Sequence, residues 1–237
     1  MLAGWTQLSV GAKPVEVFDP DGALPLCVLY LHSLHEESPA ADATFTAALT
    51  QHRLRCLAPR GGACWWAARV CPAFDAELTP ERYLLDVLVP WAAARWSLGP
   101  RAVAVAGAEM GGQGAVRLAL KHPARFPVAA SVSGAFDLQD WYGLGTPLDD
   151  MYDSRERCRL DSAVLHIDAR EWPPHLWLCC AADDAATFWG NDRLHEKLSA
   201  MGVPHTAELN ARPAYEMTGP MLGFVADALA KEARRLN

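Results

Sequence analysis

The sequence predicts a single α/β domain, built on a mostly parallel central sheet with helices on both faces. Three observations lead to this fold class. The 237 residues, 51% of them hydrophobic and 21% charged, are enough for one full core without disulfides. Short apolar runs alternate with helical patterns along the whole chain. These runs are continuous rather than alternating in polarity, which is typical of strands covered on both faces.

The strands are expected in the following order. Residues 1–20 predict an antiparallel lead-in of two strands, Thr6–Val10 and Val15–Phe18, that turn at Gly11. A further strand is expected to begin at His205, after Gly202. The inner strands are predicted from the continuous apolar runs Leu24–Leu31, Arg53–Ala58, Ala102–Ala106, Val128–Val132 and Leu176–Ala181.

Helical patterns separate these strands. The predicted helices are Ala41–Gln51, Pro80–Trp96, Met110–Lys121, Asn191–Met201 and Pro220–Leu236. Thr79 is the expected N-cap of the second helix, with Pro80 in its first turn. Pro90 inside the same pattern predicts a kink or a break. Residues 137–175 are the least regular segment, and we expect them near the functional site. The whole sequence, residues 1–237, is expected to form one domain.

Composition excludes several classes of protein. The net charge of −7 predicts no nucleic-acid partner. No apolar run approaches the ~20 residues needed to cross a bilayer, and the first residues lack a signal-peptide pattern, so we expect no membrane association and a cytoplasmic location. The seven cysteines show no zinc-binding spacing, which predicts reduced thiols and neither a metal nor another cofactor. The alternative is a reactive thiol, of which Cys64 is the first candidate.

The most informative segment is VAVAGAEMGGQGAVRLALKHP, residues 103–123, in which an apolar strand runs into a glycine-flanked turn and then a helix. In α/β-hydrolases this geometry is the nucleophile elbow, G-x-S-x-G. Gly107 and Gly111 occupy the two glycine positions, and Glu109 stands where the serine nucleophile would be.

From about Leu24 to Leu229 the chain resembles the esterase D and S-formylglutathione hydrolase-like esterases, the α/β-hydrolase group that includes the antigen 85 mycolyltransferases. The segments that carry the resemblance are VLYLHS (28–33), LAPRGGACWW (57–66), LLDVLVPWAAARW (84–96), the elbow (107–123), SVSGAFD (131–137) and LWLCCAADDAATFWGNDRLHEKLSAMGVP (176–204). The resemblance implies an α/β-hydrolase fold and a catalytic triad of serine, aspartate and histidine in that chain order.

Two of the three triad positions are substituted. Glu109 stands at the nucleophile position, and Asp184 at the acid position is intact, with Asp183 beside it. Pro213 falls at or near the histidine position, and no histidine follows His205. Without the hydroxyl and its imidazole base the triad mechanism fails. The Glu109 carboxylate is expected to accept hydrogen bonds from the backbone donors of the oxyanion hole.

The sequence therefore predicts a catalytically inactive homologue that binds a small molecule or a protein. A homodimer is left open. The residues expected to form the binding site are His32, Ser33, Met110 and Trp66. Four aromatic residues are expected around the mouth of the binding site: Trp65, Trp66, Phe188 and Trp189. One alternative is an ester hydrolase in which Glu109 works with His32 or His35. Another is that these two histidines form a weak metal site. A purely structural subunit with a closed pocket is another.

Overall fold

The computed structural model describes residues 1–235, with the backbone alone for Ala211. Within them one eight-stranded sheet has the order β1-β2-β4-β3-β5-β6-β7-β8. The strands are β1 Trp5–Val10, β2 Lys13–Phe18, β3 Cys27–Leu31, β4 Arg55–Pro59, β5 Val103–Ala108, β6 Val128–Val132, β7 His175–Ala181 and β8 Thr206–Ala211.

The pairing of the strands confirms the predicted mostly parallel sheet. β1 pairs with β2, and β2 with β4, in antiparallel register, while β4, β3, β5, β6, β7 and β8 are parallel neighbours. The strand expected over Leu24–Leu31 begins only at Cys27. Pro25 lies in the missing part and has no N–H to donate to a sheet.

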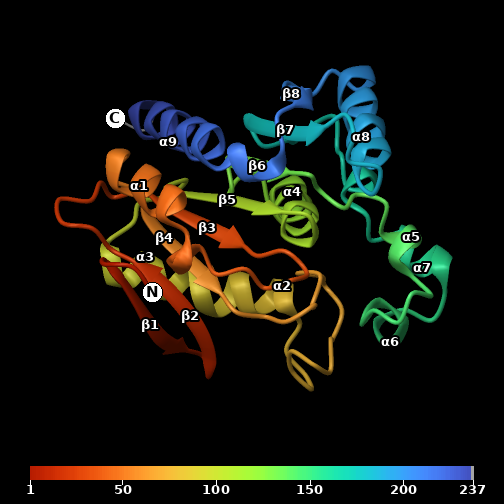
Figure 1. The fold of residues 1–237 in the computed structure, drawn as a ribbon, viewed down its shortest axis with the longest axis horizontal. Coiled ribbons are helices and arrows are strands. Elements are labelled where there is room, and N and C mark those ends of the chain that lie inside the picture. Colours follow the sequence, from red (N-terminus) through yellow and green to blue (C-terminus); the bar gives the residue numbers. More distant parts are fainter. Residues whose placement is uncertain (236–237) are drawn as a thin grey trace.

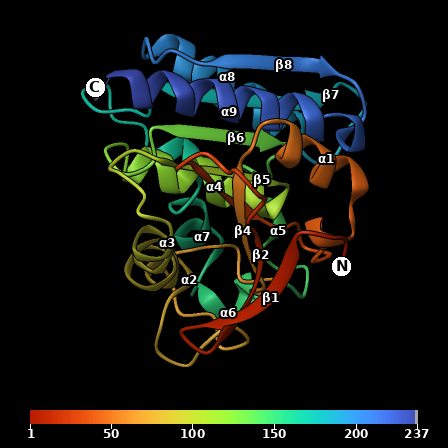
Figure 2. The same ribbon diagram turned by 90° about the vertical axis from the view of Figure 1, so that its left-hand side faces the viewer.

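Helices cover both faces of the sheet (Figure 1). On one face α1 (Ala43–Gln51) packs beside α9 (Thr218–Arg235), and their apolar residues share a core with the sheet. On the other face lie α4 (Met110–Lys121) and α8 (Phe188–Ala200), over a second core. Figure 2, turned by 90°, shows α9 running alongside β6 on this face of the sheet.

The helix predicted over Pro80–Trp96 is present but changes its winding. It comprises α2 (Pro80–Arg82), the π-helical turn η2 (Tyr83–Leu88) and α3 (Val89–Trp96). The N–H of Val89 bonds to the carbonyl of Leu84, five residues earlier. Pro90 has no N–H for the regular ladder, and a wider turn before it relieves the clash with the preceding turn. The expected kink is therefore a π-helical turn.

The segment 137–175 contains four short helices, α5 (Leu138–Trp141), α6 (Leu148–Met151), α7 (Arg155–Arg159) and η3 (Ala163–Leu165). It is joined to α4 by a buried ion-pair network. The Arg117 guanidinium, 1% exposed, pairs with Asp161 of this segment and with Glu81 of α2. Because Arg117 is satisfied on both sides, its charge is retained inside the protein.

All seven cysteines are unpaired and buried, as expected for reduced thiols. Burial raises the pKa of the Cys64 thiol far above its usual range. A buried, protonated thiol is a poor nucleophile, so this environment contradicts the alternative of a reactive Cys64. No helix in residues 1–235 is long and apolar enough to span a membrane.

Candidate functional site

The turn between β5 and α4 keeps the geometry of a nucleophile elbow. Glu109 has φ 49° and ψ −114°, a backbone conformation rarely adopted by a non-glycine residue. A Cβ on Gly111 would lie 1.9 Å from the carbonyl oxygen of Leu31, and one on Gly107 would lie 2.4 Å from the backbone of Gly111. Both positions therefore require glycine, and the sharp turn persists although a glutamate has replaced the nucleophile.

Hydrogen bonds hold this strained backbone. The Glu109 N–H donates to the carbonyl of Val132 at 3.0 Å. The Glu109 carbonyl accepts from the N–H groups of Gln113 and Ala135, each at 3.0 Å. Conformations of this kind cost about 1–3 kcal/mol and persist where the surroundings fix them. The elbow is thus fixed by its neighbours rather than by the side chain that it presents.

The Glu109 side chain is half-buried and reaches into a cavity. Burial raises the pKa of its carboxyl group, and the charges of Glu37 and Asp184 raise it further. His35 and the backbone N–H of Leu34 act in the opposite direction. Leu34 follows β3, where the resemblance places the oxyanion strand, so a backbone donor from that strand faces the carboxylate. The part of the chain that the structure describes gives the carboxylate no second donor.

Asp184, at the acid position, lies in the turn just before α8, whose N-cap is Thr187. Its carboxylate accepts from the Thr187 hydroxyl at 2.6 Å and from the N–H groups of Ala186 and Thr187 at 3.2 Å. Such contacts between an aspartate and the next residues are a local turn motif. They occupy both oxygens of Asp184 without any histidine.

Pro213, at the histidine position, is exposed and precedes a short helix, η4 (Ala214–Glu216). Tyr215 from this helix is 76% exposed and lines the cavity. Among the lining residues within 1–235 there is no histidine. His205 lies elsewhere, paired with His195 at 2.8 Å between ring nitrogens.

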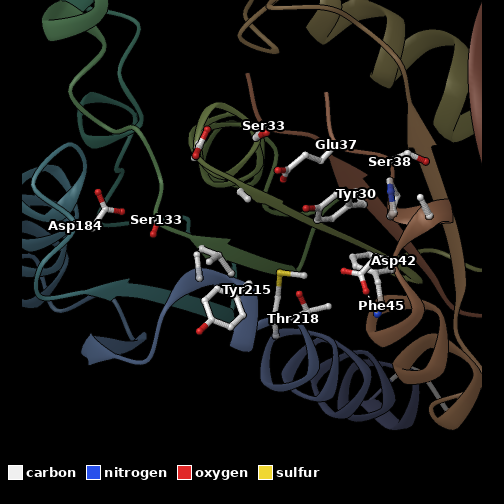
Figure 3. Close-up of a pocket in the computed structure, with 17 residues that line it drawn as sticks. Tyr30, Ser33, Glu37, Ser38, Asp42, Phe45, Ser133, Asp184, Tyr215 and Thr218 are labelled. Carbon is white, nitrogen blue, oxygen red and sulfur yellow. Dashed lines mark hydrogen bonds between the residues drawn. The ribbon is translucent and has the colours of Figure 1, made fainter. Parts of the chain in front are cut away.

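The cavity has a volume of about 680 Å³ and opens at the carboxyl ends of β3, β5 and β6. In parallel α/β sheets this edge is where ligands bind. Figure 3 shows side chains from separate elements around it, with Glu37 and Tyr30 on the side of β3, Asp42 and Phe45 near α1, Tyr215 and Thr218 near α9, and Asp184 across from them.

Of the four binding residues predicted from the sequence, Ser33 lines the cavity and the other three do not. His32 is 2% exposed. Its Nε2 accepts from the Gly61 N–H at 3.0 Å and its Nδ1 lies 2.7 Å from the carbonyl of Ser33, so the ring is neutral with the proton on Nδ1. Burial lowers the pKa of His32. Its ring is therefore committed to holding the loops together, which argues against its use as a relocated base.

The predicted positions of the aromatic residues and of Met110 are corrected in the same way. Trp65 and Trp66 are each 1% exposed inside the core rather than at a pocket mouth. A Cβ on Gly114 would lie 2.6 Å from Trp66, so Trp66 packs directly against α4. The Met110 side chain is fully buried, and its sulfur accepts a hydrogen bond from the backbone N–H of Trp65 at 3.2 Å. Trp189 is exposed outside the cavity lining.

Sequence reasoning missed most of the residues that line the cavity. Glu37 and Asp42 follow β3, and Tyr30 lies within that strand. Polar residues that directly follow a central strand often indicate a ligand site, and the acidic residues after residue 35 show this pattern. No comparable signal marks Tyr215, because only folding brings η4 to this edge. Residues 137–175, expected near the site, contribute nothing to the lining.

Metal chemistry has no support in the described residues, which contain no group of three or more histidine, cysteine, aspartate or glutamate side chains arranged to hold an ion. His32 and His35 are therefore not part of such a group. His35 is exposed and lies close enough to Glu109 to lower its pKa.

Comparisons with known proteins agree with this architecture. Residues 58–221 match the family model described as "Putative esterase". Similar solved structures include the fluorophosphonate-binding serine hydrolase FphF of Staphylococcus aureus (17% identity, 95% of this chain and 98% of that chain, TM-score 0.74). MPT51 (FbpC1) of Mycobacterium tuberculosis is 21% identical over 96% and 100% of the two chains, with a TM-score of 0.75.

An S-formylglutathione hydrolase from Agrobacterium tumefaciens is 15% identical, covers 100% of this chain and 98% of its own, and has a TM-score of 0.75. At these identities the solved structures show a shared fold. No curated protein sequence matches the chain. The predicted family resemblance and the predicted α/β-hydrolase fold are confirmed.

Proposed function

Because the chain belongs to the "Putative esterase" family of α/β-hydrolase-like proteins, we propose that it is a non-catalytic member that binds a small molecule in the cavity beside Glu109. The observation that carries the proposal is the elbow. Its strained turn is retained at φ 49°, but the residue presented to the cavity is a carboxylate instead of a hydroxyl.

The chemistry of ester cleavage supports inactivity. A serine hydrolase needs an attacking hydroxyl, and an imidazole that takes and returns its proton. The elbow presents a carboxylate in place of the hydroxyl, and no imidazole lines the cavity within residues 1–235. The oxygens of Asp184 already accept hydrogen bonds from residues 186–187. Backbone donors and binding by themselves leave only ~10³–10⁴-fold acceleration over water in such enzymes.

The open cavity supports binding over a purely structural role. Its volume of about 680 Å³ lies within the roughly 300–1,000 Å³ of small-molecule sites. A purely structural subunit would have no need for an open cavity, and a closed pocket was the prediction for that alternative. The lining combines apolar and aromatic side chains with carboxylates and hydroxyls that can orient a ligand.

Ester hydrolysis tests the catalytic half of the proposal. We expect the wild type to hydrolyse p-nitrophenyl acetate and butyrate no faster than Glu109→Gln. The matched control is Asp183→Asn, which removes a neighbouring exposed carboxylate that does not line the cavity. A wild-type rate above background that is lost in Glu109→Gln and kept in Asp183→Asn would contradict the proposal.

Thermal stabilisation by small molecules tests the binding half. Ligands that bind only the folded state raise its melting temperature. Thr218→Trp narrows the cavity, whereas Asp227→Trp adds the same side chain at an exposed position of α9. We expect ligands found with the wild type to stabilise Asp227→Trp equally and Thr218→Trp less. Equal stabilisation of both variants would place binding outside the cavity.

A second candidate function is supported by His35, whose charge acts on Glu109. In this carboxylic-ester hydrolase the Glu109 carboxylate would accept a proton from the water that attacks the ester carbonyl, and His35 would protonate the departing alkoxide. Its signature is hydrolysis lost in both Glu109→Gln and His35→Gln. Loss in Glu109→Gln alone would exclude His35 from the reaction.

A further inference from the structure

The geometry of the cavity points to a ligand class: we infer that it binds an organic cation, an ammonium group carried on an apolar or aromatic body. This inference rests on the proposed binding function and adds the charge and shape of the ligand. It begins from the cavity itself, which is large enough for such a molecule and is walled by both rings and carboxylates.

Negative charge enters the cavity from four separate segments. The lining contains Glu37 after β3, Asp42 before α1, Glu109 at the elbow and Asp184 before α8. Over residues 1–235 the lining includes no lysine, arginine or histidine. The excess of acidic over basic side chains is therefore much stronger in the cavity than in the protein as a whole, which carries 21 basic and 28 acidic side chains.

Two of these carboxylates accept hydrogen bonds from neutral donors in their own turns. Asp42 accepts the N–H groups of Thr44 and Phe45 at 2.8 and 3.0 Å, and Asp184 is held in its own turn. In the described part of the chain neither Glu37 nor Glu109 forms an ion pair. Glu37 is exposed and Glu109 is half-buried, so a charge that approaches Glu109 from the cavity interacts in a medium of lower effective dielectric than water.

The carboxylates act on the same small space. Glu37, Asp42 and Glu109 all raise the pKa of Tyr30, after the larger effect of its burial. Glu37 and Asp184 likewise raise the pKa of Glu109. Figure 3 shows Glu37 beside Tyr30, with Asp184 on the far side of the cavity. A cation placed between these groups would replace their mutual repulsion by attraction, whereas an anion would increase it.

Aromatic rings supply the apolar part of the site. Tyr30 and Phe45 meet edge to face with ring centroids 4.8 Å apart. Tyr215 is largely exposed and lies toward the other side of the cavity, near Thr218 (Figure 3). An ammonium group is attracted to the face of such rings, and the attached hydrocarbon gains from leaving water. The carboxylates come from four segments rather than a compact cluster, which suits an extended organic cation better than a metal ion.

Titration calorimetry with three probes of equal size tests the inference. The probes are 4-phenylbutylammonium, 4-phenylbutanol and 4-phenylbutyrate, which carry a positive, a neutral and a negative end. We expect the ammonium to bind the wild type about tenfold or more tightly than the alcohol, and the butyrate to bind most weakly. Glu109→Gln and Glu37→Gln should each weaken ammonium binding on the order of tenfold and leave alcohol binding unchanged. The control Asp183→Asn should change neither.

The other outcomes overturn the inference in distinguishable ways. Equal or tighter binding of the alcohol or the butyrate would show that the cavity takes small molecules without selecting a cation, which leaves the proposed function standing. Equal losses in Asp183→Asn would assign the effect to general surface charge. Failure of all three probes to bind, with circular dichroism showing a folded protein, would reject the cationic class. The ester-hydrolysis assay decides independently whether the protein is catalytic.

Discussion

Replacing Glu109 by glycine or by alanine separates the strain of the elbow from the burial of its carboxylate. Both variants remove the acidic group, so they differ mainly in the presence of a Cβ on a backbone at φ 49° and ψ −114°. Alanine keeps the strain of about 1–3 kcal/mol that this conformation imposes on a non-glycine residue. Glycine relieves it but loses about 0.5–1 kcal/mol through the greater freedom of its unfolded chain.

The difference between these effects predicts that Glu109→Gly is at least as stable as Glu109→Ala, by up to about 2.5 kcal/mol. Urea unfolding at pH 7, followed by circular dichroism, measures it, and equal slopes in urea would show that the unfolded states are comparable. Ala94→Gly in α3 is the reference substitution, because this exposed helical residue should lose about 1 kcal/mol in the usual direction. If Glu109→Gly were the less stable of the pair, the backbone at residue 109 would be unstrained and the elbow argument would fail.

Three further outcomes are expected. The raised pKa of Glu109 means that the folded state favours its protonated form. This carboxyl group's contribution to stability is therefore present at low pH and is lost as pH rises through the folded-state pKa. Glu109→Gln should gain stability relative to the wild type over that rise, as measured by urea unfolding at a series of pH values. Arg117→Met should destabilise the protein by about 3–5 kcal/mol, because it leaves Glu81 and Asp161 without their buried cation, and unfolding midpoints matching the wild type would show that the network is not needed. The double variant Glu109→Ser, Pro213→His should acquire p-nitrophenyl ester hydrolysis, since the turn and the Leu34 amide are already in place, and adding Asp184→Asn should remove it; no gain in the double variant would mean that substitution of the triad is not the main obstacle.

Features that depend on neighbours in the chain could be predicted well. The predicted bounds of Val128–Val132 and Met110–Lys121 agree with β6 and α4. Continuous apolar runs identify strands buried on both faces, and the glycines of GAEMGG identify a turn too tight for other residues. The substitution at residue 109 was visible for the same reason, since the pattern around it is short and local.

Features that depend on where a side chain turns were predicted poorly. His32 and Trp66 follow central strands, as ligand-binding residues often do, but both lie in the interior. The reason for Trp66 is the space above Gly114 on α4, a residue 48 positions away in the sequence. For His32 it is the N–H of Gly61, which satisfies its ring nitrogen from another loop.

The amino-acid order alone thus specifies the α/β alternation, the parallel sheet and an elbow that carries a carboxylate in place of a hydroxyl, because each follows from burial and backbone sterics over a few residues. The acidic, aromatic character of the cavity emerges only on folding. Glu37, Asp42, Asp184 and Tyr215 belong to segments up to 178 residues apart, and they meet because the carboxyl ends of parallel strands lie at one edge of the sheet.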